Sequence, residues 1–130
     1  KCSMKISEIF KKKGEDFFRL EEEIEVLKTL KKSKCVIAIG GGAFMNKKVR
    51  NIILENSLSI WLDLNLKTLN KRIKWNKKRP LINDRNSLSQ IQELYEKRKN
   101  IYKLANYKID CKHLSKKNIV DKIIIFYENQ

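Results

Sequence analysis

The strongest constraint on the fold is an apolar run that ends in three consecutive glycines, Val36–Ala43. The continuous apolar stretch Val36–Ile39 is typical of a parallel strand that is buried on both faces. The glycines that follow carry no Cβ, so the backbone there can turn sharply and lie close to a ligand. Because ligands of open α/β sheets bind at the carboxyl ends of the strands, the pattern predicts a ligand site at residues 40–43. A flexible turn is the alternative explanation of the same glycines.

The remaining sequence alternates predicted helices with predicted strands. The strands cover residues 58–64 and 107–111. This alternation favours a parallel sheet with right-handed crossovers, and 130 residues suffice for one domain with one core. The predicted helices cover residues 3–13, 15–32, 46–56, 66–75 and 87–105, and a terminal helix carries Val120, Ile123, Ile124 and Tyr127 at spacings that predict burial.

The composition is that of a globular protein, with 42% hydrophobic and 35% charged residues. No apolar run approaches the roughly 20 residues that span a bilayer. No signal peptide is visible at the start of the sequence, so we expect a cytoplasmic protein without a membrane contact. Cys35 and Cys111 lie in apolar runs, and none of the three cysteines has CxxC spacing, which indicates reduced residues of the core.

The net charge of +15 indicates either an anionic partner or a solvated, lysine-rich surface. The few aromatic residues are not interleaved with the basic ones, which argues against a base-stacking site for nucleic acid. Nucleic-acid binding is therefore an alternative that rests on charge alone. Only six of the 30 basic residues are arginines. Because a guanidinium offers a planar, bidentate fork that lysine lacks, the arginines are the candidates for specific contacts.

Arg19 is the first such candidate. Glu22 and Glu23 follow it by three and four residues on the predicted helix 15–32, so their side chains are its neighbours. Two interpretations stay open at this point. The arginine either forms an ordinary surface ion pair or is held in place to receive the carboxylate of a ligand.

Seven short segments stand in a characteristic order along the chain: Ser7–Phe10, Gly14–Glu15, Phe18–Glu22, Gly40–Ala43, Trp61–Asp63, Arg79–Ile82 and Arg98–Tyr102. Together they resemble the shikimate kinase family. The resemblance covers nearly all 130 residues and implies a three-layer α/β fold, the P-loop kinase fold, with a parallel sheet of order 2-3-1-4-5. It also implies a monomer that transfers the γ-phosphoryl group of ATP, with Mg²⁺, to the 3-hydroxyl of shikimate in aromatic amino acid biosynthesis.

The resemblance implies a shikimate site that joins two parts of the chain. Arg19 and Arg98 match the family's pair of carboxylate-binding arginines, and Glu22 would support Arg19. Gly41 and Gly42 match the positions whose backbone approaches the substrate ring. Residues 1–32 would then form the substrate-binding helices.

The nucleotide site is implied in the same way. Arg79 matches the catalytic arginine of the family's lid loop, here residues 76–86, which reaches the transferring phosphates. Arg72 matches the arginine that stacks on adenine. Lys112 and His113 fall in the family's adenine loop, although an exposed histidine without a role is the alternative for His113.

The sequence departs from the family at the phosphate-binding loop. It contains no GxxxxGK[ST] motif, because its glycines are Gly14 and the triplet, and that loop supplies the phosphate cradle and a ligand of Mg²⁺. No metal ligand is predicted in this chain. The match corresponds to the last two thirds of a family member without its first two strands, so the strand between Val36–Ile39 and Ser59–Leu64 would be missing and their edges exposed.

We therefore expect a fragment of a longer kinase or a truncated product, inactive by itself. The first alternative is a catalytically dead relative that binds a metabolite or a partner. A related small-molecule kinase, such as a gluconate kinase, is another.

Overall fold

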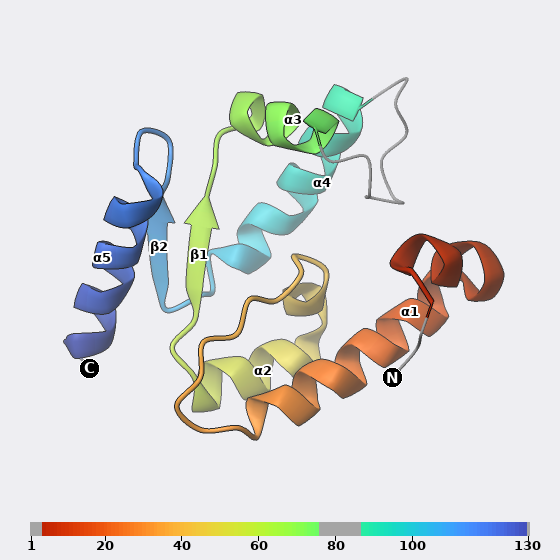
Figure 1. The fold of residues 1–130 in the computed structure, drawn as a ribbon, viewed down its shortest axis with the longest axis horizontal. Coiled ribbons are helices and arrows are strands. Elements are labelled where there is room, and N and C mark those ends of the chain that lie inside the picture. Colours follow the sequence, from red (N-terminus) through yellow and green to blue (C-terminus); the bar gives the residue numbers. More distant parts are fainter. Residues whose placement is uncertain (1–3, 76–86, 130) are drawn as a thin grey trace.

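The computed structural model describes residues 4–75 and 87–129 (Figure 1). The predicted lid loop, with Arg79, lies outside the described residues. None of the helices in the described ranges is long and apolar enough to cross a membrane. The elements are the helices α1 (Ile6–Leu30), α2 (Lys47–Asn56), α3 (Leu66–Trp75), α4 (Ser87–Tyr102) and α5 (Lys116–Glu128), the short 3₁₀ helix η1 (Ala43–Met45), and the strands β1 (Ile60–Asp63) and β2 (Tyr107–Asp110).

The sheet of the described residues consists of β1 and β2, which pair in parallel. Ile60 faces Tyr107 and Asp63 faces Asp110, so the register contains no bulge. The chain between the two strands carries α3 and α4, which confirms the predicted strand–helix alternation of an α/β fold. The start of the pair is fixed by Ser59, whose backbone amide and hydroxyl both donate to the side-chain oxygen of Asn106, at 2.9 and 2.5 Å.

The predicted strand Val36–Ile39 does not form. This segment is irregular, and Val36 is 98% exposed. A strand requires a hydrogen-bonding neighbour, and no described residue supplies one here. Cys35, expected in the core as part of the same run, is exposed for the same reason, whereas Cys111 is buried as predicted. Leu62 on β1 is also 47% exposed, so one apolar side chain of the sheet is uncovered in this part of the molecule.

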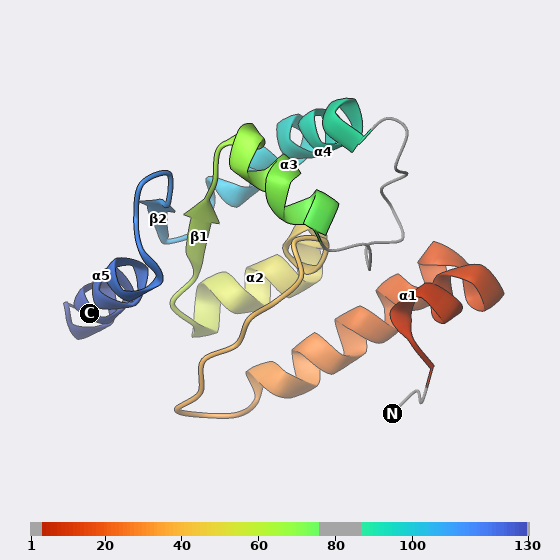
Figure 2. The same ribbon diagram turned by 45° about the horizontal axis from the view of Figure 1, so that its top comes forward.

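The two helices predicted to meet at Gly14 form one element with a kink. Gly14 has φ +82° and ψ 175°, which interrupts the helical geometry of α1. Glycine adopts this left-handed φ without the steric cost that a Cβ imposes. Phe10 before the kink and Phe18 after it pack with ring centroids 4.8 Å apart, so the first turns fold back on the longer part of α1 (Figure 2).

The core lies where α1, α2 and α4 meet. Phe44 of η1 and Val49 and Ile53 of α2 form its buried centre, and partly buried residues pack around them. Asn46 starts α2 as predicted, because its side-chain oxygen accepts from the backbone amides of Lys48 and Val49. The surrounding residues are Val26, Leu27, Leu30, Ile39, Leu54, Ile101, Tyr102 and Ala105. This core fixes the segment just before it, the glycine triplet.

Helix α5 is less buried than the sequence predicts. Val120, Ile124 and Tyr127 are all exposed. The helix contacts the sheet through Phe126, whose ring stacks on Tyr107 with centroids 4.2 Å apart. Within the described residues α5 packs on the edge strand β2, so only one side of the helix is covered.

Candidate functional site

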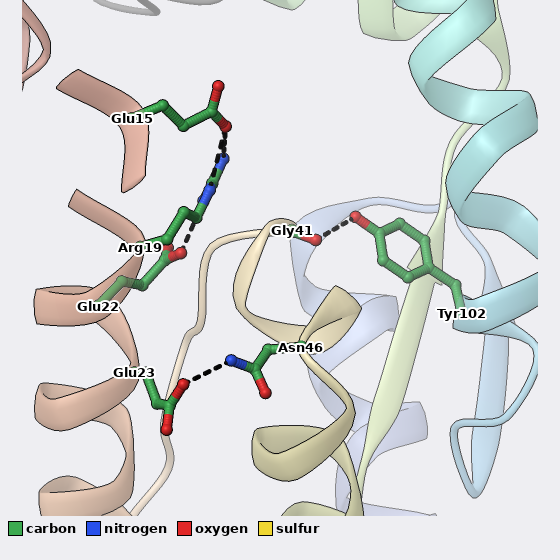
Figure 3. A network of polar contacts seen from close by, with 7 residues as sticks. All are labelled: Glu15, Arg19, Glu22, Glu23, Gly41, Asn46 and Tyr102. Atoms are coloured by element: carbon green, nitrogen blue, oxygen red, sulfur yellow. Dashed lines mark hydrogen bonds and ion pairs between the residues drawn. The ribbon is translucent and has the colours of Figure 1, made fainter. Parts of the chain in front are cut away.

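Arg19 is held between two carboxylates of its own helix. Its Nη1 donates to Glu22 Oε2 at 2.6 Å, and its Nε and Nη2 donate to Glu15 Oε1 at 3.2 and 3.0 Å (Figure 3). The side chain of Glu22 is 16% exposed and that of Glu15 is 48% exposed. The Glu22 pair follows from the spacing of three. Sequence reasoning missed Glu15, although its spacing of four is an equally good signal.

The surroundings of Arg19 favour its protonated form. Burial disfavours the cation, but hydrogen bonds and Coulombic attraction to Glu22 and Glu15 outweigh it and raise the pKa of Arg19 above its ordinary value. Glu23, the other neighbour that the sequence suggested, points to α2. Its carboxylate accepts from Asn46 Nδ2 at 2.7 Å and from Lys48 Nζ at 2.8 Å. Arg19 is therefore a fixed cation oriented by Glu22 and Glu15.

The glycine triplet lies between Arg19 of α1 and Arg98 of α4. A Cβ on Gly42 would overlap Arg19 Nη1, with Arg19 Cζ at 2.7 Å, and a Cβ on Gly41 would lie 3.3 Å from Arg98 Nη1. Because consecutive Cα atoms are about 3.8 Å apart, both guanidinium groups flank one dipeptide. The five residues predicted for a substrate site thus converge, and their roles in binding stay predictions.

Tyr102 completes this arrangement and was not predicted. Its hydroxyl donates to the carbonyl oxygen of Gly41 at 2.7 Å (Figure 3). A Cβ on Gly41 would overlap the same hydroxyl. The available sequence signal was the spacing of four from Arg98, which places both side chains on one face of α4.

Two of the residues predicted for the nucleotide, Lys112 and His113, follow the carboxyl end of β2. Lys112 and His113 line a cavity of about 330 Å³ together with Lys108 and Lys122, a volume at the lower end of small-molecule sites. Arg72 of α3 is close by. Burial, with a smaller contribution from Asp110, raises the pKa of the neighbouring Cys111 thiol, and the charge of Arg72 opposes this rise.

A further polar cluster links the two strands to α4. Asp63 accepts a hydrogen bond from Tyr95 Oη at 3.2 Å and forms an ion pair with Lys108 Nζ at 2.8 Å. Lys108 also lies 4.7 Å from the centroid of the Trp61 ring. Burial is the largest cause, and Asp63 the next, of the raised pKa of Tyr95. No spacing along the chain predicts this cluster, because its members come from the three elements β1, α4 and β2.

Across residues 4–75 and 87–129, no three His, Cys, Asp or Glu side chains are grouped so that they could hold a metal ion. The whole sequence also lacks the GxxxxGK[ST] motif that would cradle the phosphates of ATP. What the residues do form is a two-arginine site around a glycine loop, which suits a planar anion such as a carboxylate.

The fold and this site define an α/β protein whose glycine loop lies between two arginines. The family model described as shikimate kinase matches residues 1–128. The chain therefore belongs to the shikimate kinase family.

Relatives and solved structures agree with this assignment. The chain is 37% identical to the shikimate kinase of Bartonella quintana over 98% of its own length and 61% of the relative's. It is 35% identical to that of Sulfurihydrogenibium over 95% of its own length and 74% of the relative's. These relatives are longer than this chain, which also spans only 59% of the Bartonella henselae shikimate kinase.

Two solved structures share the fold. Shikimate kinase from Acinetobacter baumannii in complex with shikimate superposes with a TM-score of 0.91 at 25% identity, over 97% of this chain and 72% of that one. Shikimate kinase from Aquifex aeolicus gives a TM-score of 0.78 at 30% identity, over 93% and 70%. The small sheet and its helices are therefore part of a shikimate kinase fold.

Proposed function

We propose that this chain carries the shikimate-binding part of a shikimate kinase, the enzyme that transfers the γ-phosphoryl group of ATP to the 3-hydroxyl of shikimate on the route to chorismate. The observation that supports this most directly is the convergence of Arg19 and Arg98 on the Gly41–Gly42 dipeptide. Family membership and the Acinetobacter complex with shikimate support the choice of ligand.

The substrate's carboxylate would bind to the two guanidinium groups. Each guanidinium has five N–H donors in a rigid fork that matches a carboxylate. Glu22 holds Arg19 in one orientation, so less rotamer entropy is lost when the ligand binds. The absence of a Cβ on Gly41 and Gly42 lets the Tyr102 hydroxyl and the Arg19 guanidinium lie directly against the backbone of the triplet.

Phosphoryl transfer would need groups beyond those described. The magnesium ion, when bound with ATP, neutralises charge on the phosphates. Arg79, outside the described residues, is proposed as the catalytic arginine of the lid, and Arg72, Lys112 and His113 as the contacts to adenine. Because the 130 residues contain no phosphate-binding loop motif, we propose that they bind shikimate but do not transfer phosphate by themselves. A complete enzyme of this kind would be a cytoplasmic monomer.

Calorimetric titration of the chain with shikimate and with its methyl ester tests the binding. We expect shikimate to bind and the ester, which lacks the charge, to bind at least tenfold more weakly, because charge-assisted hydrogen bonds are lost. Arg19→Gln and Arg98→Gln should each weaken shikimate binding by a similar factor. Lys97→Gln is the matched control, because it removes one positive charge from the exposed side of α4 next to Arg98.

Equal binding of shikimate and its ester would contradict the proposed site. A weaker affinity of Arg19→Gln or Arg98→Gln supports the site only if circular dichroism shows that the variant is folded. A second assay follows phosphate transfer from ATP by ³¹P NMR. Transfer by the 130-residue chain would refute its proposed inactivity. No binding of shikimate would favour a relative that binds another metabolite or a partner.

A further inference from the structure

Tyr102 connects the glycine triplet to helix α4. Its hydroxyl donates to the Gly41 carbonyl oxygen at 2.7 Å, across 61 positions of sequence. Its ring lies between two others, with centroids 6.4 Å from Phe44 and 5.9 Å from Trp61. Phe44 belongs to η1 and Trp61 to β1. Packing against two elements therefore fixes the ring, and with it the position of the hydroxyl.

The same hydroxyl explains why residue 41 is a glycine. All four glycines lie in the described ranges, and Gly14 alone has a positive φ. The backbone of Gly41 is thus open to other residue types, and the restriction on it is spatial. A Cβ at this position would overlap Tyr102 Oη, while the next atoms, Arg98 Nη1 and Tyr102 Cζ, lie at 3.3 and 3.5 Å. Without the hydroxyl, these remaining contacts would be close to ordinary van der Waals distances.

Arg98 and Tyr102 are one helical turn apart on α4, so they face the same side. One presents a guanidinium beside Gly41, and the other holds the carbonyl of that residue. We propose that Tyr102 is a positioning residue for shikimate binding, which fixes the glycine triplet at the correct distance from Arg98. This inference rests on the proposed function and adds to it a residue that does not itself contact the substrate.

Shikimate titrations of two variants test the role of the hydroxyl. Tyr102→Phe keeps the packed ring and removes only the hydrogen bond, so we expect shikimate to bind about tenfold more weakly, in line with the loss of one hydrogen bond. Tyr95→Phe is the matched control, because this tyrosine of the same helix donates to Asp63 and not to the triplet. Its shikimate affinity should equal that of the wild type. Unchanged affinity of Tyr102→Phe would overturn the inference.

A double-mutant cycle tests the spatial part of the argument. Gly41→Ala should abolish measurable shikimate binding in the wild-type background, because its methyl group displaces the hydroxyl and the loop with it. The double variant Gly41→Ala with Tyr102→Phe should bind better than Gly41→Ala alone, since the overlapping atom is gone. A merely structural tyrosine would give additive losses, and additivity would overturn the inference.

The thermal unfolding midpoints of the same four proteins give a readout without ligand. The double variant should have a higher unfolding midpoint than the sum of the two single changes predicts, as for its shikimate affinity. If the changes in midpoint simply add, the residues at positions 41 and 102 do not interact. If the wild-type chain fails to bind shikimate, the proposed function and the ligand named here are both overturned. If the wild-type chain binds shikimate and Tyr102→Phe binds it equally well, only the proposed role of Tyr102 is overturned.

Discussion

At the scale of single residues, the two carboxylates on Arg19 are not equivalent. Glu22 accepts at 2.6 Å and is largely shielded from solvent, whereas the pair with Glu15 is 3.0 Å long and half exposed. Exposed ion pairs on a helix stabilise little, because water and salt screen them. Glu22 is therefore the residue that sets the direction of the guanidinium, and Glu15 adds a weaker contact on its other edge.

This difference predicts unequal effects of one substitution at two positions. Glu22→Gln should weaken shikimate binding about tenfold, because the ion pair with Arg19 is replaced by a weaker hydrogen bond from the guanidinium to an uncharged amide. Glu15→Gln should change the affinity by about twofold or less. Calorimetric titration of both variants measures this, and each serves as the control for the other. Equal losses would show that the two carboxylates orient Arg19 together.

At the scale of elements, Asn46 joins α2 to α1. Its side-chain oxygen caps α2 by accepting from the amides of Lys48 and Val49 at 2.9 and 3.2 Å. Its side-chain nitrogen donates to Glu23 of α1 at 2.7 Å (Figure 3). The glycine triplet lies directly between these two helices in the chain, so the contact that holds them together also holds the site.

Two substitutions of Asn46 should distinguish the stability that comes from capping α2 from the stability that comes from the hydrogen bond to Glu23. Asn46→Ala removes both and should lower the free energy of unfolding by about 1–2 kcal/mol. Asn46→Ser keeps a good capping oxygen but loses the donor to Glu23, so its loss should be smaller. Urea unfolding followed by circular dichroism measures both. If serine is as destabilising as alanine, the link to Glu23 matters and the cap does not.

The pairing of Glu23 should make the stability depend on pH. Hydrogen bonds from Lys48 and Asn46 lower the pKa of Glu23 below its ordinary value. A lowered pKa means that the contribution is present above the ordinary value and is lost as the pH falls through the lowered one. The difference in unfolding midpoint between wild type and Glu23→Gln should therefore shrink from pH 7 to pH 3.

Helices and caps could be predicted from the sequence because their signals are local. Asn46 and Asn65 cap the helices predicted at 46–56 and 66–75, and Gly14 interrupts α1. The strand expected at Val36–Ile39 was wrong, because a strand depends on a neighbour that the described residues do not supply. The same cause leaves Val120 exposed on α5, a helix with one covered side.

The candidate site also contains some contacts that local spacing predicts and others that it does not. The pair of Arg19 and Glu22 follows from spacing on one helix. The convergence of Arg19, Arg98 and the glycine triplet was expected only from the resemblance to a family. The hydrogen bond from Tyr102 to Gly41 joins positions 61 residues apart, so no periodicity in the sequence could show it.

At the scale of the whole molecule, the net charge of +15 is the dominant electrostatic feature. Like charges on one small surface repel one another and destabilise the compact state. Salt screens this repulsion, with a Debye length that falls from about 30 Å at 0.01 M to about 10 Å at 0.1 M. The six ion pairs found among the described residues are mostly exposed, so their weakening by salt is the smaller effect.

Raising KCl from 0.01 to 0.2 M should therefore raise the thermal unfolding midpoint, measured by circular dichroism at constant pH. The double variant Lys11→Gln, Lys12→Gln removes two charges from exposed positions of α1, so its midpoint at low salt should be higher and its response to salt smaller. Both proteins should converge at 0.2 M, where the repulsion is screened in each. A midpoint that falls with salt would mean instead that attractive pairs such as Arg19–Glu22 and Lys108–Asp63 outweigh the repulsion among the lysines.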